Sequence, residues 1–231
     1  MDFKKIIDQK DNAAKYIVEE ITHIIKTCGK RAPGSEGEKK SCEYMADVLK
    51  NDCGCEDVKI ESYKVHPKAF YGWIYFTCTF VLLSMVLFFF APVIGIPLII
   101  AGFVLTILEF GLYKKAIDRL FKEQTSHNVT AIKKCKGEVK RRIIFNGHPD
   151  ATWEWPVNYA LGGVGFEGHA ISVVLSALYY LVISIISVIK NGISFGMPDM
   201  SDPLTKAGLI GLIFVPFVIG LYFMENYNRV V

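Results

Sequence analysis

The sequence predicts an α/β protein into which two membrane-spanning helical hairpins are inserted, giving four membrane helices. Three observations support this fold class. Four long stretches are almost free of charge, residues 58–65 alternate between polar and apolar side chains except at Glu61-Ser62, and an apolar run at 143–145 is soon followed by the tripeptide His148-Pro149-Asp150. Such alternation is typical of a half-exposed strand, and a short β-branched run is typical of a buried one.

The apolar composition predicts a membrane protein. Of the 231 residues 52% are hydrophobic, and the mean hydropathy is +0.31, which is too apolar for an ordinary soluble domain. A helix rises ~1.5 Å per residue, so about 20 residues cross the ~30 Å hydrocarbon layer. Four such stretches are too many to be core helices, because the rest of so short a chain could not cover them. The predicted spans are 71–90, 92–113, 169–189 and 207–224.

The four spans form two hairpins. A short apolar turn rich in proline and glycine joins the first pair, and a polar loop at 190–206 joins the second. The chain therefore divides into an α/β part that is interrupted twice. Its predicted segments are 1–69 (first α/β segment), 70–113 (first hairpin), 114–166 (second α/β segment, with the His-x-Asp loop), 167–225 (second hairpin) and 226–231 (return to the soluble side).

Charge near the spans predicts the orientation. An even number of crossings places both α/β segments on one side, and that side carries most of the flanking lysine and arginine, which favours the cytoplasm. We expect an integral protein of the plasma membrane whose main partner is the lipid bilayer. The net charge of +3 is too small to predict nucleic-acid binding. The basic residues are Lys59, Lys64, Lys68, Lys114, Lys115, Arg119, Lys122 and Arg229 on the α/β side, against Lys190 and Lys206 on the other.

The α/β segments predict two helices and three strands. Apolar residues at helical spacing predict a helix over 13–26, and Ser35 is a suitable N-cap for a second helix that continues to about Leu49. The strands are expected at 58–65, 129–132 and 143–145, the last two joined by a turn at 136–138. The six cysteines show no disulfide framework, so we expect reduced thiols.

Three motifs in the α/β segments indicate the kind of site. His148-x-Asp150 follows the expected strand at 143–145, and an imidazole two residues from a carboxylate can be a metal ligand with its own orienting partner. Upstream stand residues 31–38 (RAPGSEGE) and 126–134 (SHNVTAIKK). In this order the three motifs resemble the di-zinc aminopeptidase family of metallopeptidases, peptidase family twenty-eight, which includes glutamate carboxypeptidase-like and transferrin-receptor-like members.

The resemblance implies a fold, a cofactor and a reaction. The fold is a mixed-sheet zinc-exopeptidase-like sandwich, here only partial, and the cofactor is two zinc ions. His148 is the implied metal ligand, Asp150 accepts its other ring N–H, and the implied substrate is a peptide that loses its amino-terminal residue. On the residues alone His148 could instead end a strand and Asp150 stand in a turn.

The implied site is incomplete in this sequence. The family also needs a bridging Asp, a Glu-Glu pair, a further acidic ligand and a second His, whereas no Glu-Glu pair follows Asp150 and His169 is the only later histidine. We therefore expect the amino-terminal part of a longer membrane peptidase that is inactive by itself. The alternative is a non-catalytic membrane protein that keeps a peptidase-derived domain for binding or assembly. Self-association into a homo-oligomer is compatible with either hypothesis.

Overall fold

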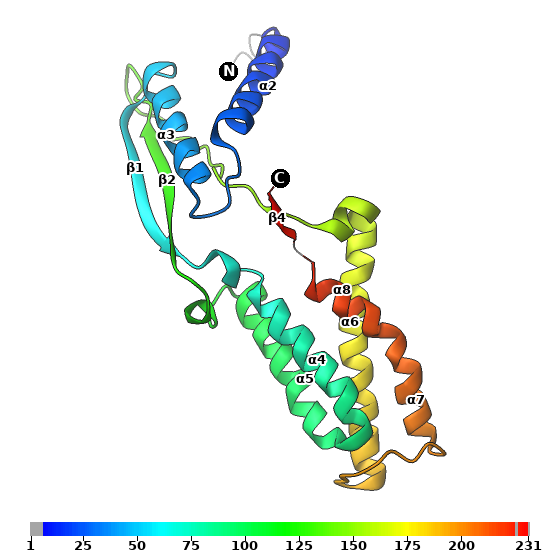
Figure 1. The fold of residues 1–231 in the computed structure, drawn as a ribbon. Helices are drawn as coiled ribbons and strands as arrows, with labels where there is room; N and C mark the ends of the chain where they lie inside the picture. Colours follow the sequence, from blue (N-terminus) through cyan, green and yellow to red (C-terminus); the bar gives the residue numbers. More distant parts are fainter. Residues whose placement is uncertain (1–6, 225, 231) are drawn as a thin grey trace. The chain divides into compact units, whose positions relative to one another are not determined.

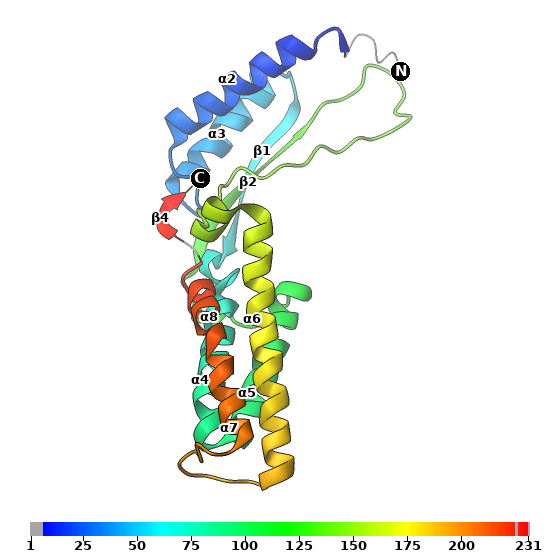
Figure 2. The same cartoon turned by 90° about the vertical axis from the view of Figure 1, so that its right-hand side faces the viewer.

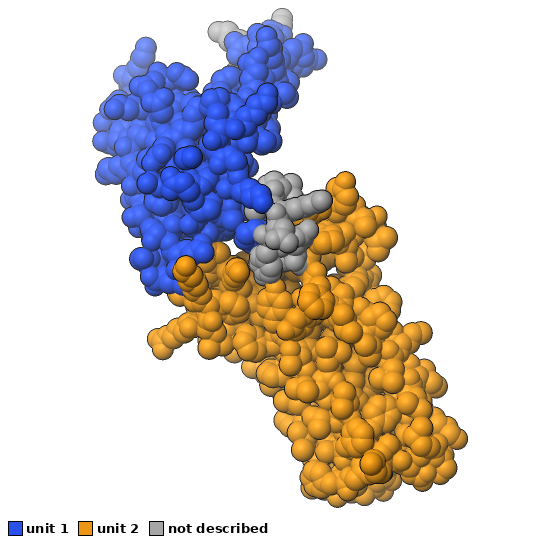
Figure 3. All heavy atoms as spheres, viewed as in Figure 1, with its two compact units in different colours: residues 1–65, 123–153, 227–231 blue, residues 66–122, 154–226 orange. Residues whose placement is uncertain are grey.

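The structure is a computed structural model that describes residues 7–224 and the backbone of residues 226–230. The chain folds into two compact units, each of which collects separate stretches of sequence (Figure 3). Unit 1 contains the α/β part, and unit 2 contains the apolar helices. Unit 1 consists of residues 1–65, 123–153 and 227–231, and unit 2 consists of residues 66–122 and 154–226.

Unit 1 is a small two-stranded sheet with one helix, α3 (Glu36–Asn51), packed on it and a second helix, α2 (Lys10–Cys28), packed on α3 (Figure 1). The strands pair antiparallel, with Ile60 opposite Val129, and α3 packs on both of them. The expected helices and the first two expected strands are confirmed, because their apolar spacing and capping residues act locally. The elements are α2 (Lys10–Cys28), α3 (Glu36–Asn51), β1 (Glu56–Val65) and β2 (Gln124–Ile132), with a second strand pair formed by β3 (Trp153–Glu154) and β4 (Asn226–Val230).

The prediction of a third strand at 143–145 is wrong. These residues lie in an irregular segment after β2, and the side chain of Phe145 is 92% exposed. An apolar run becomes a buried strand only when a neighbouring strand edge and a covering layer are present. Residues 143–145 pair with neither strand of the sheet and are not covered by another layer, so the turn at 136–138 does not close a hairpin. The sheet of unit 1 is therefore two strands, and the zinc-exopeptidase sandwich stays a prediction.

Unit 2 is a bundle of apolar helices (Figures 1 and 2). Four of its helical segments are long and apolar enough to cross a membrane: Pro67–Phe90, Pro92–Gly111, Pro156–Asn191 and Pro203–Tyr222. The third begins earlier than the sequence predicts, because its helix, α6 (Pro156–Asn191), continues through the glycine-rich stretch with a kink at Gly162, whose φ is +69°. The elements are η1 (Pro67–Ala69), α4 (Gly72–Phe90), α5 (Pro92–Thr106), η2 (Ile107–Gly111), η3 (Asp118–Leu120), α6 (Pro156–Asn191), α7 (Pro203–Gly211), η4 (Leu212–Phe214) and α8 (Val215–Tyr222).

Close contact between small residues and hydroxyl groups joins these helices. The Tyr180 hydroxyl donates to the Gly208 carbonyl at 2.7 Å, and the Ser84 hydroxyl donates to the Gly95 carbonyl at 3.0 Å. A Cβ on Gly208 would lie 2.3 Å from the ring of Phe88, so only glycine lets α7 approach α4 this closely. Small residues and interhelical hydroxyl bonds are the usual means of packing helices in a lipid environment.

Glu109 is the single acidic residue in the second predicted span, and the structure gives it a local role. Its side chain is buried, and Oε1 accepts a hydrogen bond from the backbone N–H of Ile117 at 2.9 Å. The carboxylate therefore ties the end of the second span to the turn that follows it. A buried acid that binds a backbone donor is accounted for by structure, and it needs no transport function.

Candidate functional site

The candidate site begins at the amino-terminal end of α3, where the first motif folds into a cap. The Ser35 hydroxyl accepts from the backbone N–H of Glu38 at 3.2 Å, and the Gly34 N–H donates to Glu38 Oε2 at 2.8 Å. This is a serine N-cap with a glutamate three residues later that reaches back toward the cap. Gly37 allows the turn to close, because a Cβ there would lie 2.0 Å from the carbonyl oxygen of Lys30.

Glu38 joins the first motif to the second. Its side chain is 1% exposed, and Oε1 accepts a hydrogen bond from the hydroxyl of Ser126 on β2. The hydroxyl of Tyr63 on β1 lies 3.3 Å from the same Ser126 oxygen. A carboxylate buried this completely is tolerated because donors surround it. The motif at 31–38 is thereby fixed on the sheet.

Arg31 joins the first motif to the third. Its Nε donates to the carbonyl of Pro149 at 3.2 Å, and its own carbonyl accepts from the Ala151 N–H at 2.8 Å. These two bonds hold the residues on both sides of Asp150. The loop that carries His148 and Asp150 is therefore attached to the amino-terminal end of α3, although no strand precedes it. The three motifs meet within unit 1.

The imidazole of His148 and the carboxylate of Asp150 face each other. His148 Nδ1 lies 3.2 Å from Asp150 Oδ1 and 3.1 Å from the Asp150 carbonyl oxygen. The histidine side chain is 80% exposed, whereas that of the aspartate is 28% exposed. An Nδ1–H that donates to this carboxylate leaves the lone pair of Nε2 directed away, which is the tautomer a metal ligand needs.

Cys42 lies beneath this loop, and it is not available as a metal ligand. Its side chain is fully buried, and the Sγ donates to the carbonyl of His127 at 3.5 Å. Burial, helped by the negative charges of Glu38 and Asp150, raises the pKa of the Cys42 thiol to about 11. Metals bind the thiolate, so at neutral pH this sulfur acts as an apolar core atom.

The described residues supply one part of a zinc site. Within residues 7–224 no three side chains of His, Cys, Asp or Glu lie together closely enough to hold a metal ion. Catalytic zinc takes three protein ligands and a water. His148 and Asp150 fit the ligand and its orienting carboxylate, and further ligands are needed to complete the site. No catalytic step is therefore assigned to a metal held by these residues alone.

Two residues of the site could not be singled out from the sequence. Arg31 is one member of a motif and Ser126 one member of a strand, yet they carry the bonds that bring the motifs together. The sequence offered one indication of the Ser126–Glu38 bond. It is a serine at an inward-facing strand position together with a glutamate in the first turn of a helix. Its partner could not be named, because the two residues are 88 positions apart.

Comparison of the chain with protein-family models, with curated proteins and with solved structures gives no match. By its structure, the protein is a helix-rich chain with a small α/β unit and four helices that are long and apolar enough to span a membrane.

Proposed function

We propose that this chain belongs to a membrane-anchored, zinc-dependent peptidase of the aminopeptidase type, with unit 1 in the cytoplasm and unit 2 in the plasma membrane. The observation that carries the proposal is the His148–Asp150 pair, 3.2 Å apart and held by Arg31 against the capped end of α3. The anchored loop and the exposed, oriented imidazole support this proposal. The substrate would be a peptide with a free amino terminus.

The residues have separate roles in this proposal. Nε2 of His148 binds the metal, and Asp150 holds the imidazole in the required tautomer and orientation. Arg31 fixes the loop through its backbone and side chain. Zinc, when bound, supplies a Lewis acid for the scissile carbonyl and an activated water. The described residues add no further ligand or general base to this pair, so a working site would need groups beyond those that they bring together.

A second function is favoured by the exposed apolar surface of unit 1. The segment at 143–145 is exposed, and so is an isoleucine stripe on α2 formed by Ile17, Ile21 and Ile25. Apolar surface of this kind often marks a protein-binding face. Under this alternative the chain is a non-catalytic membrane protein whose peptidase-like unit binds or assembles with another protein, including a second copy of itself.

The test of the peptidase proposal replaces His148 by alanine in the complete native polypeptide. We expect loss of bound zinc and at least a hundredfold loss in the hydrolysis of aminoacyl-coumarin substrates, because a zinc ligand is removed. His23→Ala is the matched control, since His23 is exposed in the same unit and only stacks on Tyr44. Zinc content is measured by mass spectrometry of the purified protein. Unchanged zinc and activity in His148→Ala would contradict the proposal, whereas a wild-type protein with neither zinc nor activity would favour the binding alternative.

The proposed orientation has its own test, because exposed cysteines occur in unit 1 and not in the loop between α6 and α7. Cys53 and Cys135 are exposed. We expect a membrane-impermeant maleimide to label them only after the cells are permeabilised. Met200→Cys, combined with Cys53→Ser and Cys135→Ser, is expected to be labelled in intact cells, because residue 200 lies in the opposite loop. Labelling of Cys53 in intact cells would contradict the proposed orientation, because it would place unit 1 outside the cell.

A further inference from the structure

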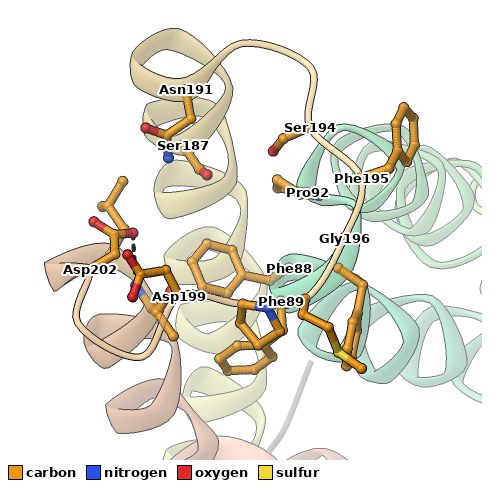
Figure 4. A pocket seen from close by; sticks show the side chains of 15 residues that line it. Phe88, Phe89, Pro92, Ser187, Asn191, Ser194, Phe195, Gly196, Asp199 and Asp202 are labelled. Carbon is orange, nitrogen blue, oxygen red and sulfur yellow. Dashed lines mark hydrogen bonds between the residues drawn. The ribbon is translucent and has the colours of Figure 1, made fainter.

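Unit 2 contains a cavity of about 370 Å³ that the sequence does not reveal (Figure 4). It lies where all four candidate spans begin or end, since Phe90, Pro92, Asn191 and Leu204 all contribute to its wall. Its size falls within the range of pockets that hold small organic ligands. No residue of the proposed peptidase site lines it, so a function of this cavity is independent of the peptidase proposal.

Aromatic rings form one side of the cavity. Phe88 and Phe89, from the last turn of α4, lie below the loop that joins α6 to α7 (Figure 4). The two rings meet edge to face with centroids 5.3 Å apart, and Phe88 also packs against Tyr180 in the bundle core. The rings are thereby held in place. The faces of such rings carry negative electrostatic potential and attract cations.

Two carboxylates give the cavity its charge. Asp199 and Asp202 line it, whereas no lysine or arginine does so. Neither carboxylate forms an ion pair with any residue in the described part of the chain. Hydrogen bonds from the hydroxyl and the N–H of Ser201, together with the charge of Lys206, hold the pKa of Asp199 below its usual value, so this group is ionised at neutral pH.

The loop around the cavity is fixed by hydrogen bonds. The Gly196 N–H donates to the Phe90 carbonyl at 3.0 Å, which attaches the loop to the end of α4. The carboxylate of Asp202 accepts from the Thr205 N–H at 3.3 Å and caps α7. Because the carboxyl ends of α4 and α6 and the amino ends of α5 and α7 meet at this level, the helix dipoles oppose one another. The electrostatic potential in the cavity is therefore set by the two aspartates, and it is negative.

Ser187, on α6, adds a hydroxyl group to the wall of the cavity (Figure 4). The residue is 8% exposed. A hydroxyl can donate to or accept from a polar group of a ligand or a water in the cavity.

We propose that this cavity binds an organic ammonium group, with Phe88 and Phe89 facing its apolar carbon atoms and Asp199 and Asp202 balancing its charge. A small inorganic cation is strongly hydrated and has no carbon atoms to pack against the rings. A neutral apolar molecule would leave the charge of the carboxylates unbalanced. An anion is excluded by their charge. The shared chemistry is that of choline or ethanolamine, which reaches this place either as a free amine or as the headgroup of a lipid whose chains lie along the spans.

Calorimetry on the full chain, purified in a maltoside detergent, tests the proposal with two probes. The probes are choline chloride and dihexanoyl phosphatidylcholine, each compared with sodium chloride at equal ionic strength. The double variant Asp199→Asn with Asp202→Asn keeps the oxygens that accept from Ser201 and Thr205, so the loop and the cap of α7 are retained. Phe89→Leu removes a ring and keeps an apolar side chain. Glu167→Gln removes an exposed carboxylate of α6 outside the cavity and is the matched control.

We expect at least about tenfold weaker binding in the double variant and in Phe89→Leu, and no change in Glu167→Gln. Binding of choline with this pattern supports the proposal and identifies a free amine as the source. Binding of the phospholipid alone, with the same pattern, supports it and identifies a lipid headgroup. Failure of both probes to bind overturns the proposal, and so does binding that both variants leave unchanged or heat that sodium chloride reproduces. Unaltered melting temperatures show that the variants remain folded.

Discussion

Replacement of Glu38 by alanine is expected to destabilise unit 1 by about 3 kcal/mol, because two hydrogen-bond donors lose their only charged acceptor. The Gly34 N–H and the buried Ser126 hydroxyl both donate to this carboxylate. Ser126 is only 2% exposed, so its hydroxyl is out of reach of bulk water. The loss would separate the amino-terminal end of α3 from β2, and with it the support of the His148 loop.

Hydrogen–deuterium exchange of the full chain measures this effect where it occurs. We expect the amides of α3 (Glu36–Asn51) to exchange on the order of a hundredfold faster in Glu38→Ala, and the amides of unit 2 to keep their rates. Glu43→Ala is the control, because Glu43 is exposed on the same helix and only forms a long surface pair with Lys39. Equal rates in both variants would show that Glu38 does not hold the motifs together.

Local pattern was sufficient for the parts of the fold that depend on neighbours in sequence. The helix after Ser35 could be predicted because the cap and the acidic first turn act within four residues. The four spans could be predicted because a stretch without charge of that length has few other uses. The contact between His148 and Asp150 was expected from their spacing, and the structure has it. The role of His148 as a zinc ligand stays a prediction.

The features that could not be predicted from the sequence depend on contacts between residues far apart in the chain. The run at 143–145 has the composition of a buried strand, yet it is exposed and pairs with neither strand of the sheet. The bonds of Arg31 to the His148 loop join residues more than a hundred positions apart. The loop expected at 190–206 spans residues 192–202 in the structure, between α6 and α7. Its two aspartates line the same cavity as Phe88 and Phe89. This arrangement depends on how the two hairpins pack, which cannot be predicted from hydrophobic periodicity.

Replacement of Ile100 by lysine is expected to cost about 3 kcal/mol, because this residue lies at the middle of the span Pro92–Gly111. Its side chain is 48% exposed in the isolated chain. In water a lysine at an exposed helical position would be neutral or would improve solubility. In a bilayer the same position faces hydrocarbon, where a charge must reach the interface or leave the membrane. The substitution therefore distinguishes the two solvents that could surround unit 2.

An insertion assay on the full chain, with glycosylation acceptors placed on either side of α5, measures the cost. We expect Ile100→Lys to lower the ratio of inserted to non-inserted α5 about a hundredfold relative to the native chain. Ile193→Lys is the matched control, since Ile193 is an exposed isoleucine in the loop after α6 and lies outside the candidate spans. Ile99 would be uninformative, because its side chain is buried in the bundle and a charge there is costly in either solvent. If Ile100→Lys inserts as well as Ile193→Lys, the apolar surface of α5 does not face lipid, and unit 2 must be covered by protein instead.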